Sequence, residues 1–251
     1  MQAKLGEIAQ LRAPLLAILF DDMPGAIENL AIRQAEILHD VAAWMPGVRL
    51  LVCPTYYSFD PTLEKHFGAM PQDYWSTLGE LLPARVDVFW TGNRVCSERI
   101  AVADIEAINR LLGRRVALWD NYPVNDGAVR SRYLYTRALS ERDPGLRSCL
   151  AGHLCNPMNQ GVLSLPALTG LAALYGAAPA ADWLADTLGA AAWSALQEDG
   201  KCFEQRGLDA LDSAERQALV SKYEALPGPA AAEVAGWLRG EYTFDPACLT
   251  D

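Results

Sequence analysis

The residues best suited to chemistry are two adjacent aspartates, Asp21 and Asp22, which directly follow a short apolar run. Neighbouring carboxylates repel each other, and burial raises the pKa of whichever one loses the competition for charge. Such a pair can supply one ionised carboxylate and one proton donor. The pattern therefore predicts acid–base chemistry at this point of the chain.

Polar side chains also follow the other four apolar runs of the chain. They are Thr55–Tyr57, Thr91–Asn93, Asp120–Asn121 and Asn156. Because the carboxyl ends of parallel strands open on one face of an α/β fold, we expect these residues to meet the aspartates in one pocket. For any single run, the alternative that its polar residues only cap a helix or line a turn stays open.

The sequence WDNYPVND, which begins at Trp119, adds several groups that suit a sugar. Its amide and carboxylate side chains, which offer donors and acceptors for hydroxyl groups, are Asn121, Asn125 and Asp126. The rings of Trp119, Tyr57 and Trp90 could provide apolar faces for a bound ligand. Core packing is the competing interpretation of the tryptophans, and we favour it for Trp90.

The elements that must position these residues alternate between short apolar runs and helical patterns. The runs are Leu15–Phe20, Val48–Pro54, Val86–Trp90, Val116–Trp119 and His153–Asn156. The helical patterns are Leu5–Arg12, Ile27–Ala43, Tyr74–Leu82, Ala103–Leu112 and Leu163–Leu174. This alternation predicts βα units with a right-handed parallel sheet, although periodicity alone does not exclude a buried helix at a given run.

A complete (β/α)8 barrel needs about 250 residues, whereas this chain shows five strands before residue 175. We therefore predict an α/β fold in which residues 1–175 form an incomplete (β/α)8 TIM barrel of about the last five βα units. Residues 176–251 are predicted to form a helical domain. Its expected helices are Ala181–Gln197, Ser213–Leu226 and Ala230–Arg239.

Composition narrows the classes of partner and cofactor. The formal charge of −10 disfavours nucleic acid and anionic membrane surfaces as partners, and no apolar run approaches the roughly 20 residues of a membrane span. The six cysteines form no CxxC pair, so we expect free thiols and a reducing, cytoplasmic location. The three histidines are far apart in sequence, which disfavours a histidine-based metal centre. No phosphate-binding glycine loop occurs, and we expect no metal or organic cofactor.

Five short motifs, taken together, resemble the glycoside hydrolase family 84 β-N-acetylglucosaminidases, which include protein O-GlcNAcases and bacterial relatives once called hyaluronidases. In chain order they are FDD from Phe20, CPTYY from Cys53, WTG from Trp90, WDNYPVND from Trp119 and CNPM from Cys155. The double aspartate combined with WDNxxxND is the specific part. The resemblance extends from Leu15 to Tyr175, and more loosely to GEYTFDP at residues 240–246.

The resemblance implies that terminal N-acetylglucosamine is removed with retention, the substrate's 2-acetamido group acting as nucleophile and forming an oxazoline. Asp21 would orient the acetamido group. Asp22 would protonate the leaving oxygen and later activate water, a task that suits a raised pKa. The remaining implied roles are a hydrogen bond near the reacting centre from Tyr57, an acetamide pocket lined by Cys53 and Trp119, and hydroxyl binding by Asn121, Asp126 and Asn156.

Three departures from the family bear on these expectations. The glycine-rich segment on the family's first strand and a lysine on a later strand are absent, and residues 130–143 differ from the family's usual continuation. The expected partner is a glycan or glycoprotein bearing N-acetylglucosamine. A catalytically weak, sugar-binding or scaffold protein is the main alternative, and a metal-dependent hydrolase is a third. Open strand edges at both ends of the partial barrel also predict a homo-oligomer.

Overall fold

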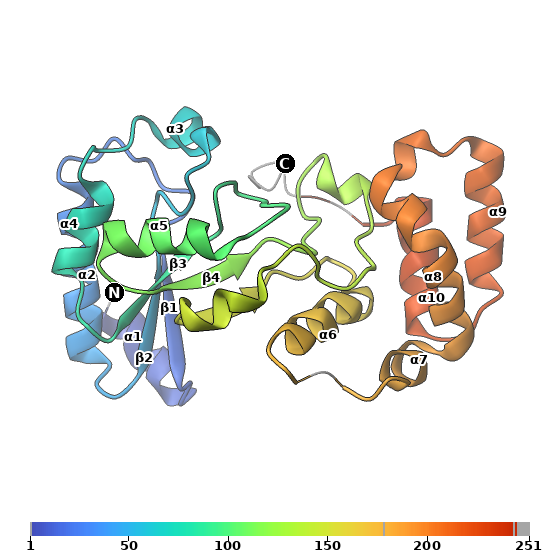
Figure 1. Ribbon diagram of the computed structural model, residues 1–251, viewed down its shortest axis with the longest axis horizontal. Coiled ribbons are helices and arrows are strands. Elements are labelled where there is room, and N and C mark those ends of the chain that lie inside the picture. The colour runs from blue at the N-terminus through green and yellow to red at the C-terminus, as the bar shows by residue number, and fades with distance from the viewer. Residues whose placement is uncertain (1, 178, 243, 245–251) are drawn as a thin grey trace. The chain divides into compact units, whose positions relative to one another are not determined.

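The computed structural model describes residues 2–177, 179–242 and 244. The chain divides into two compact units (Figure 1). The first comprises the residues up to Trp119 together with 145–154, and the second comprises 120–144 and the residues from 155 onwards. Each unit is described by itself below.

Five strands form a single sheet in the order β1-β2-β3-β4-β5. Their bounds are β1 Leu15–Leu19, β2 Arg49–Cys53, β3 Val86–Trp90, β4 Val116–Asp120 and β5 Gly152–Cys155. The first pair is parallel, with Leu15 opposite Arg49 and Leu19 opposite Cys53. Strands that neighbour each other in chain order, with helices between them, are the arrangement of a (β/α)8 barrel. The sheet is a half-barrel, as the sequence predicted.

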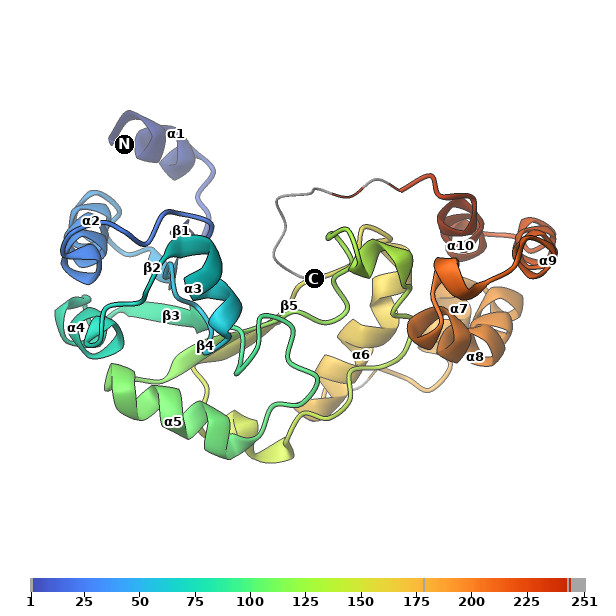
Figure 2. The same ribbon diagram turned by 90° about the horizontal axis from the view of Figure 1, so that it is seen from above.

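Three helices of the first unit pack along one side of the sheet, α2 against α4 and α4 against α5 (Figure 2). The helices of this unit are α1 Gln2–Gln10, α2 Leu30–Trp44, α3 Pro61–Phe67, α4 Tyr74–Leu81 and α5 Val102–Leu112. Helix α2 buries Leu30, Gln34, Leu38 and Val41, a stripe with helical spacing. These helices hold the strands, and therefore the loops at the carboxyl ends of the strands, in place.

Two elements differ from the sequence prediction. Helix α3 was not predicted, although Asp60 caps it by accepting a hydrogen bond from the Thr62 amide at 3.0 Å and Pro61 occupies its first turn. The single helix predicted at 181–197 is instead two helices, α7 (Trp183–Leu188) and α8 (Ala190–Gln205). They separate at Gly189, whose φ of 87° is left-handed and does not continue a helix.

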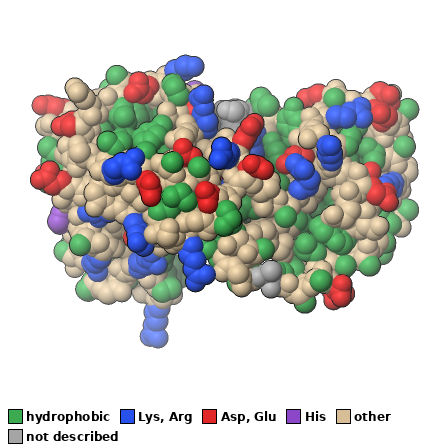
Figure 3. Space-filling model, in the orientation of Figure 1, with side chains coloured by type: hydrophobic (Ala, Val, Ile, Leu, Met, Phe, Trp, Pro, Cys, Tyr) green, Lys and Arg blue, Asp and Glu red, His purple; other side chains and the backbone are tan. Residues whose placement is uncertain are grey.

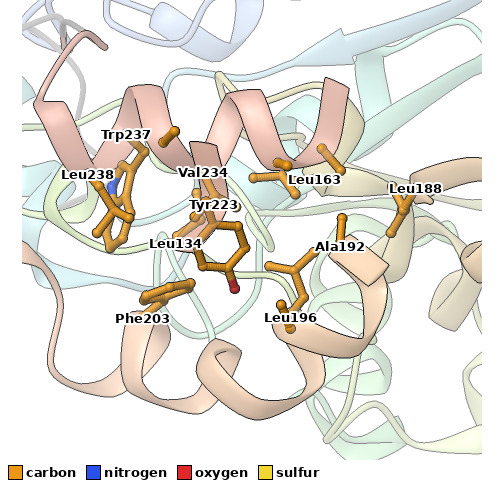
Figure 4. Packing of buried hydrophobic residues seen from close by; sticks show 14 of the residues in the cluster. Leu134, Leu163, Leu188, Ala192, Leu196, Phe203, Tyr223, Val234, Trp237 and Leu238 are labelled. Atoms are coloured by element: carbon orange, nitrogen blue, oxygen red, sulfur yellow. The ribbon is translucent and has the colours of Figure 1, made fainter. Parts of the chain in front are cut away.

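The second unit is built around a helical core (Figure 4). Besides α7 and α8, its helices are α6 Leu165–Leu174, α9 Ser213–Glu224 and α10 Pro229–Arg239. Short 3-10 turns of this unit lie at Arg130–Arg132, Val162–Ser164 and Leu208–Ala210, and a further one, Pro144–Ser148, lies mostly in the first unit. Phe203 of α8 packs against Trp237 of α10 and Tyr223 of α9, with ring centroids 5.2 and 5.9 Å apart. These buried rings join three helices into one core.

The compact units do not separate at the predicted domain boundary. Residues 120–144, and the chain from residue 155 through α6, belong with the C-terminal helices. A domain boundary between residues 175 and 176 stays a prediction. Cys248 and three residues of GEYTFDP, namely Thr243, Asp245 and Pro246, lie outside the described residues.

Acidic and basic side chains are both scattered over the face of the protein in Figure 3, together with areas of hydrophobic side chains. Among the described residues, no helix has the length and apolar character to cross a bilayer.

Candidate active site

The turn after β1 carries the two adjacent aspartates. Phe20 is buried, and its amide donates to the Cys53 carbonyl at 2.8 Å, so the start of the turn is fixed to β2. Asp21 is half-buried and Asp22 is exposed, which gives the two carboxyl groups unequal surroundings. Asp22 has a left-handed backbone with φ of 58°, a conformation that aspartate adopts more readily than most residues other than glycine.

Cys53 is the last residue of β2 and Tyr57 lies in the loop that follows, and both side chains are buried. The Thr91 amide donates to the Tyr57 carbonyl at 2.9 Å, and the Ser58 hydroxyl donates to the Gly92 carbonyl at 2.7 Å. Gly92 has φ of 116°, and a Cβ atom there would lie 2.1 Å from the Ser97 hydroxyl. Only glycine therefore fits this turn, and the loop after β3 holds Tyr57 in place.

The two aspartates, the thiol and the phenol influence one another electrostatically. Burial raises the pKa of Asp21, opposed by a backbone hydrogen bond and assisted by the charge of Asp22. Burial and the same two carboxylates raise the pKa of the Cys53 thiol well above its usual value. The pKa of Tyr57 is also raised, by burial and then by Asp22. The thiol and phenol therefore stay neutral at physiological pH. A raised pKa at Asp22 stays a prediction.

The two tryptophans of the predicted site differ in environment. Trp90 is fully buried and packs edge-on against Phe59 at 5.3 Å, which confirms core packing as its role. Trp119 is half-buried at the end of β4 and packs edge-on against Phe89 at 5.1 Å.

The loops after β4 and β5 are joined in the second unit. The Asn156 amide side chain donates to Asn121 Oδ1 at 3.0 Å, and its backbone amide donates to the Asp120 carbonyl at 2.9 Å. Asp126 is half-buried on the same loop as Asn121. The structure thus brings together two of the three residues expected to bind hydroxyl groups.

Asn125 has a structural role that differs from its predicted one. It is buried, and its Nδ2 donates to Gln160 Oε1 at 2.8 Å and to the Tyr133 carbonyl at 3.2 Å. Its Oδ1 accepts the Asn159 amide at 3.0 Å. Because both ends of the amide bind within the protein, Asn125 fixes the loop rather than offering groups to a sugar.

Sequence reasoning missed a buried ion pair beside these asparagines. Arg142 donates to both carboxylate oxygens of Asp120, from Nε at 2.8 Å and from Nη2 at 2.6 Å. The side chains are only 5% and 1% exposed. An aspartate at the end of a buried strand requires a cationic or donor partner, and this signal was available in the sequence. The identity of that partner, Arg142, could not be predicted from the sequence because it lies 22 residues away.

A family model described as beta-N-acetylglucosaminidase matches residues 1–201. The chain belongs to this family. Protein O-GlcNAcase of Rattus norvegicus is 27% identical over 187 residues, which are 70% of this chain and 20% of the relative. Protein O-GlcNAcase of Mus musculus is 27% identical over 184 residues, with the same coverage of 70% and 20%. This chain thus spans about a fifth of the length of these curated relatives.

A solved structure agrees with this assignment. A mutant of the O-GlcNAc hydrolase of Thermobaculum terrenum matches with a TM-score of 0.69 and 26% identity, over 95% of this chain and 60% of that one. The family resemblance expected from the sequence is therefore confirmed, and so is the partial-barrel fold with its C-terminal helices.

In this member of the β-N-acetylglucosaminidase family, the predicted site residues fall into two groups. Asp21, Asp22, Cys53 and Tyr57 lie together in the first unit, and Asn121 and Asn156 are paired in the second. A single pocket that contains both groups stays a prediction. Among the described residues, no three histidine, cysteine, aspartate or glutamate side chains are grouped to hold a metal ion.

Proposed function

We propose that this chain acts as a retaining β-N-acetylglucosaminidase on a protein or glycan that carries terminal N-acetylglucosamine. The observation that carries the proposal is the pair of unequal aspartates after β1, with the neutral Cys53 and Tyr57 beside them. Membership of the family supports the same reaction class. The names of the rat and mouse relatives support a glycoprotein substrate.

The reaction uses the substrate's own acetamido group. Its carbonyl oxygen attacks the anomeric carbon and forms an oxazoline, while the bond to the leaving oxygen breaks and Asp22 supplies a proton to that oxygen. Ionised Asp21 takes up the acetamido N–H proton as the oxazoline forms, which increases the negative charge on the attacking carbonyl, and it returns this proton to the nitrogen when the ring reopens. Water, deprotonated by Asp22, then adds to the anomeric carbon and reopens the oxazoline ring, so the configuration is retained.

The surrounding residues bind rather than react. Tyr57, which remains protonated, donates a hydrogen bond near the anomeric centre. Cys53 and Trp119 line the acetamide pocket. The Asn121–Asn156 pair and Asp126 bind the sugar hydroxyls, with the Asn121 amide oriented by Asn156.

The test is release of 4-nitrophenol from the N-acetyl-β-glucosaminide by the purified chain, with Asp22→Ala as the comparison. We expect turnover in the wild type and its loss in Asp22→Ala. A wild-type rate equal to buffer at high protein concentration contradicts catalysis by this chain alone. Activity lost on chelation would instead favour a metal-dependent hydrolase.

Calorimetry with a thiazoline mimic of the oxazoline tests the alternative function. Binding without turnover favours a sugar-binding or scaffold protein. A cytoplasmic location also remains our proposal, supported by five free cysteines in the described part of the chain.

A further inference from the structure

Three buried polar side chains lie close to the Asp21–Asp22 turn within the first unit. They are Gln34 on α2, Thr55 in the loop after β2 and Tyr74 at the start of α4, and each is at most 2% exposed. Most polar groups that are this deeply buried in proteins form hydrogen bonds. Nothing in the proposed reaction uses Gln34 or Tyr74.

The hydrogen bonds among these side chains run in one direction. The Tyr74 hydroxyl donates to Gln34 Oε1 at 2.6 Å, and Gln34 Nε2 donates to the Thr55 hydroxyl at 2.8 Å. The Thr55 hydroxyl in turn donates to the Phe20 carbonyl at 2.9 Å. The Thr55 amide closes the ring by donating to the Tyr74 oxygen at 3.2 Å. Because Gln34 occupies the acceptor side of the threonine oxygen, the hydroxyl proton is directed at Phe20.

The carbonyl group that accepts this hydrogen bond belongs to Phe20, the residue immediately before Asp21. The Phe20 amide is already bonded to the Cys53 carbonyl at 2.8 Å. Both backbone polar groups of Phe20 are therefore tied to β2 and its loop, and the peptide that leads into Asp21 has a defined orientation.

The far side of the turn is also held. The Gly25 amide donates to the Phe67 carbonyl at 2.8 Å. A Cβ atom on Gly25 would lie 2.1 Å from the Tyr56 hydroxyl, which itself donates to the Gly68 carbonyl at 2.7 Å. With the turn tied at residues 20 and 25, the left-handed conformation of Asp22 is maintained by its surroundings.

We propose that Thr55 is a positioning residue for the Asp21–Asp22 pair, and that Gln34 and Tyr74 set the direction of its hydroxyl bond. This inference rests on the proposed function for its effect on turnover. The chain of hydrogen bonds from α2 and α4 connects the helical layer to the residues that move protons. Catalysis is sensitive to displacements of about 1 Å, so loosening this connection lowers the rate.

The experiment compares Thr55→Val, which keeps the shape and removes the hydroxyl, with Thr55→Ser, which keeps the hydroxyl. We expect kcat on the 4-nitrophenyl substrate to fall about 10- to 100-fold in Thr55→Val with little change in KM. Thr55→Ser should restore most of the rate. Tyr74→Phe, which removes the proton that orients Gln34, should give a smaller loss, and it replaces Thr55→Val if that variant does not fold.

The matched control is Tyr223→Phe, which removes a buried phenol hydrogen bond to Asp199 of 2.9 Å in the helical core. It should lower the melting temperature and leave kcat unchanged. Equal losses of stability in Tyr223→Phe and Thr55→Val, with kcat unchanged in both, would overturn the proposal.

A carbon-13 NMR titration of the aspartate carboxyls separates this inference from the proposed function. In Thr55→Val the pKa of Asp21 should move towards its usual value, because the loosened turn admits water, whereas Tyr223→Phe should leave it unchanged. If the wild type neither hydrolyses the substrate nor binds the thiazoline, the proposed function fails, and the titration alone decides the positioning role. An unaltered Asp21 titration in Thr55→Val would reject that role.

Discussion

The surroundings of Asp21 disfavour its ionised form. Its carboxyl is half-buried beside a second carboxyl, and burial raises its pKa. Ionisation of this group is therefore easier in the unfolded chain than in the folded protein. As pH rises above the usual aspartate pKa of about 3.9, ionisation of this carboxyl lowers the free energy of the unfolded state more than that of the folded state. The resulting loss of stability persists at neutral pH.

Asp21→Asn should consequently raise the melting temperature at pH 7 and abolish turnover. Below the usual aspartate pKa, Asp21 is protonated in both the folded and the unfolded wild type, so the increase in melting temperature should disappear there. Thermal unfolding at several pH values measures the effect, with Asp40→Asn, at an exposed position on α2, as the control. A lower melting temperature for Asp21→Asn at pH 7 would contradict this account.

A second prediction for single residues concerns the buried ion pair between Asp120 and Arg142. Removing one member leaves the other charge buried without its partner, which costs about 3–5 kcal/mol. Arg142→Met should therefore destabilise the protein by about that amount in chemical denaturation. The double variant with Asp120→Leu should recover much of the loss, and a double variant as unstable as Arg142→Met would argue against the pair as the cause.

At the scale of elements, the close approach of α4 and α5 depends on a glycine. A Cβ atom at Gly79 would lie 2.0 Å from the Leu112 carbonyl oxygen at the end of α5. Overpacking of this kind costs about 1–3 kcal/mol because the helices must separate. These helices support β3 and β4, so their displacement also affects the loops at the carboxyl ends of those strands.

Gly79→Ala should thus lower the free energy of unfolding by about 1–3 kcal/mol. Gly6→Ala in α1 is the matched substitution, because no atom lies within 4 Å of its Cβ position. An exposed helical alanine is favoured over glycine by about 1 kcal/mol, so Gly6→Ala should be neutral or stabilising. Urea titration of both variants measures the difference, and opposite signs are expected.

At the scale of the whole molecule, the first strand of the half-barrel lies at an edge of the sheet. Leu15 and Leu19 of β1 are 38% and 50% exposed, and Leu154 of β5, at the other edge, is 44% exposed. Apolar edge strands are sites of further strand pairing. These edges support the predicted homo-oligomer, with a second copy of this chain as the partner.

The statement that the chain binds neither nucleic acid nor membrane also stays a prediction.

Sedimentation should show concentration-dependent association of the chain. Leu19→Lys should weaken it, because a lysine on an edge strand opposes pairing. Leu111→Lys, at a 48% exposed position on α5, is the control and should have no effect. A monomer at all concentrations would contradict association through the edge.

The sequence alone determined the features that depend on covalent order and local pattern. Short apolar runs separated by helical patterns predicted all five strands, because a buried parallel strand needs little more than a run of that kind. The adjacency of Asp21 and Asp22 is itself a fact of sequence. Together with WDNYPVND, it was sufficient to indicate the family that the comparisons confirm.

Only the tertiary structure decided which polar side chains form hydrogen bonds within the protein, and with which partners. Asn121 and Asn125 are the same residue type four positions apart, yet Asn121 accepts a hydrogen bond from Asn156, whereas Asn125 bonds to Gln160 and Asn159. The partner of Thr55 on α2 is 21 residues distant, and that of Asp120 is 22 residues distant. Hydrogen bonds depend on positions in space to within a few tenths of an ångström, and chain folding sets those positions over separations that no local pattern records.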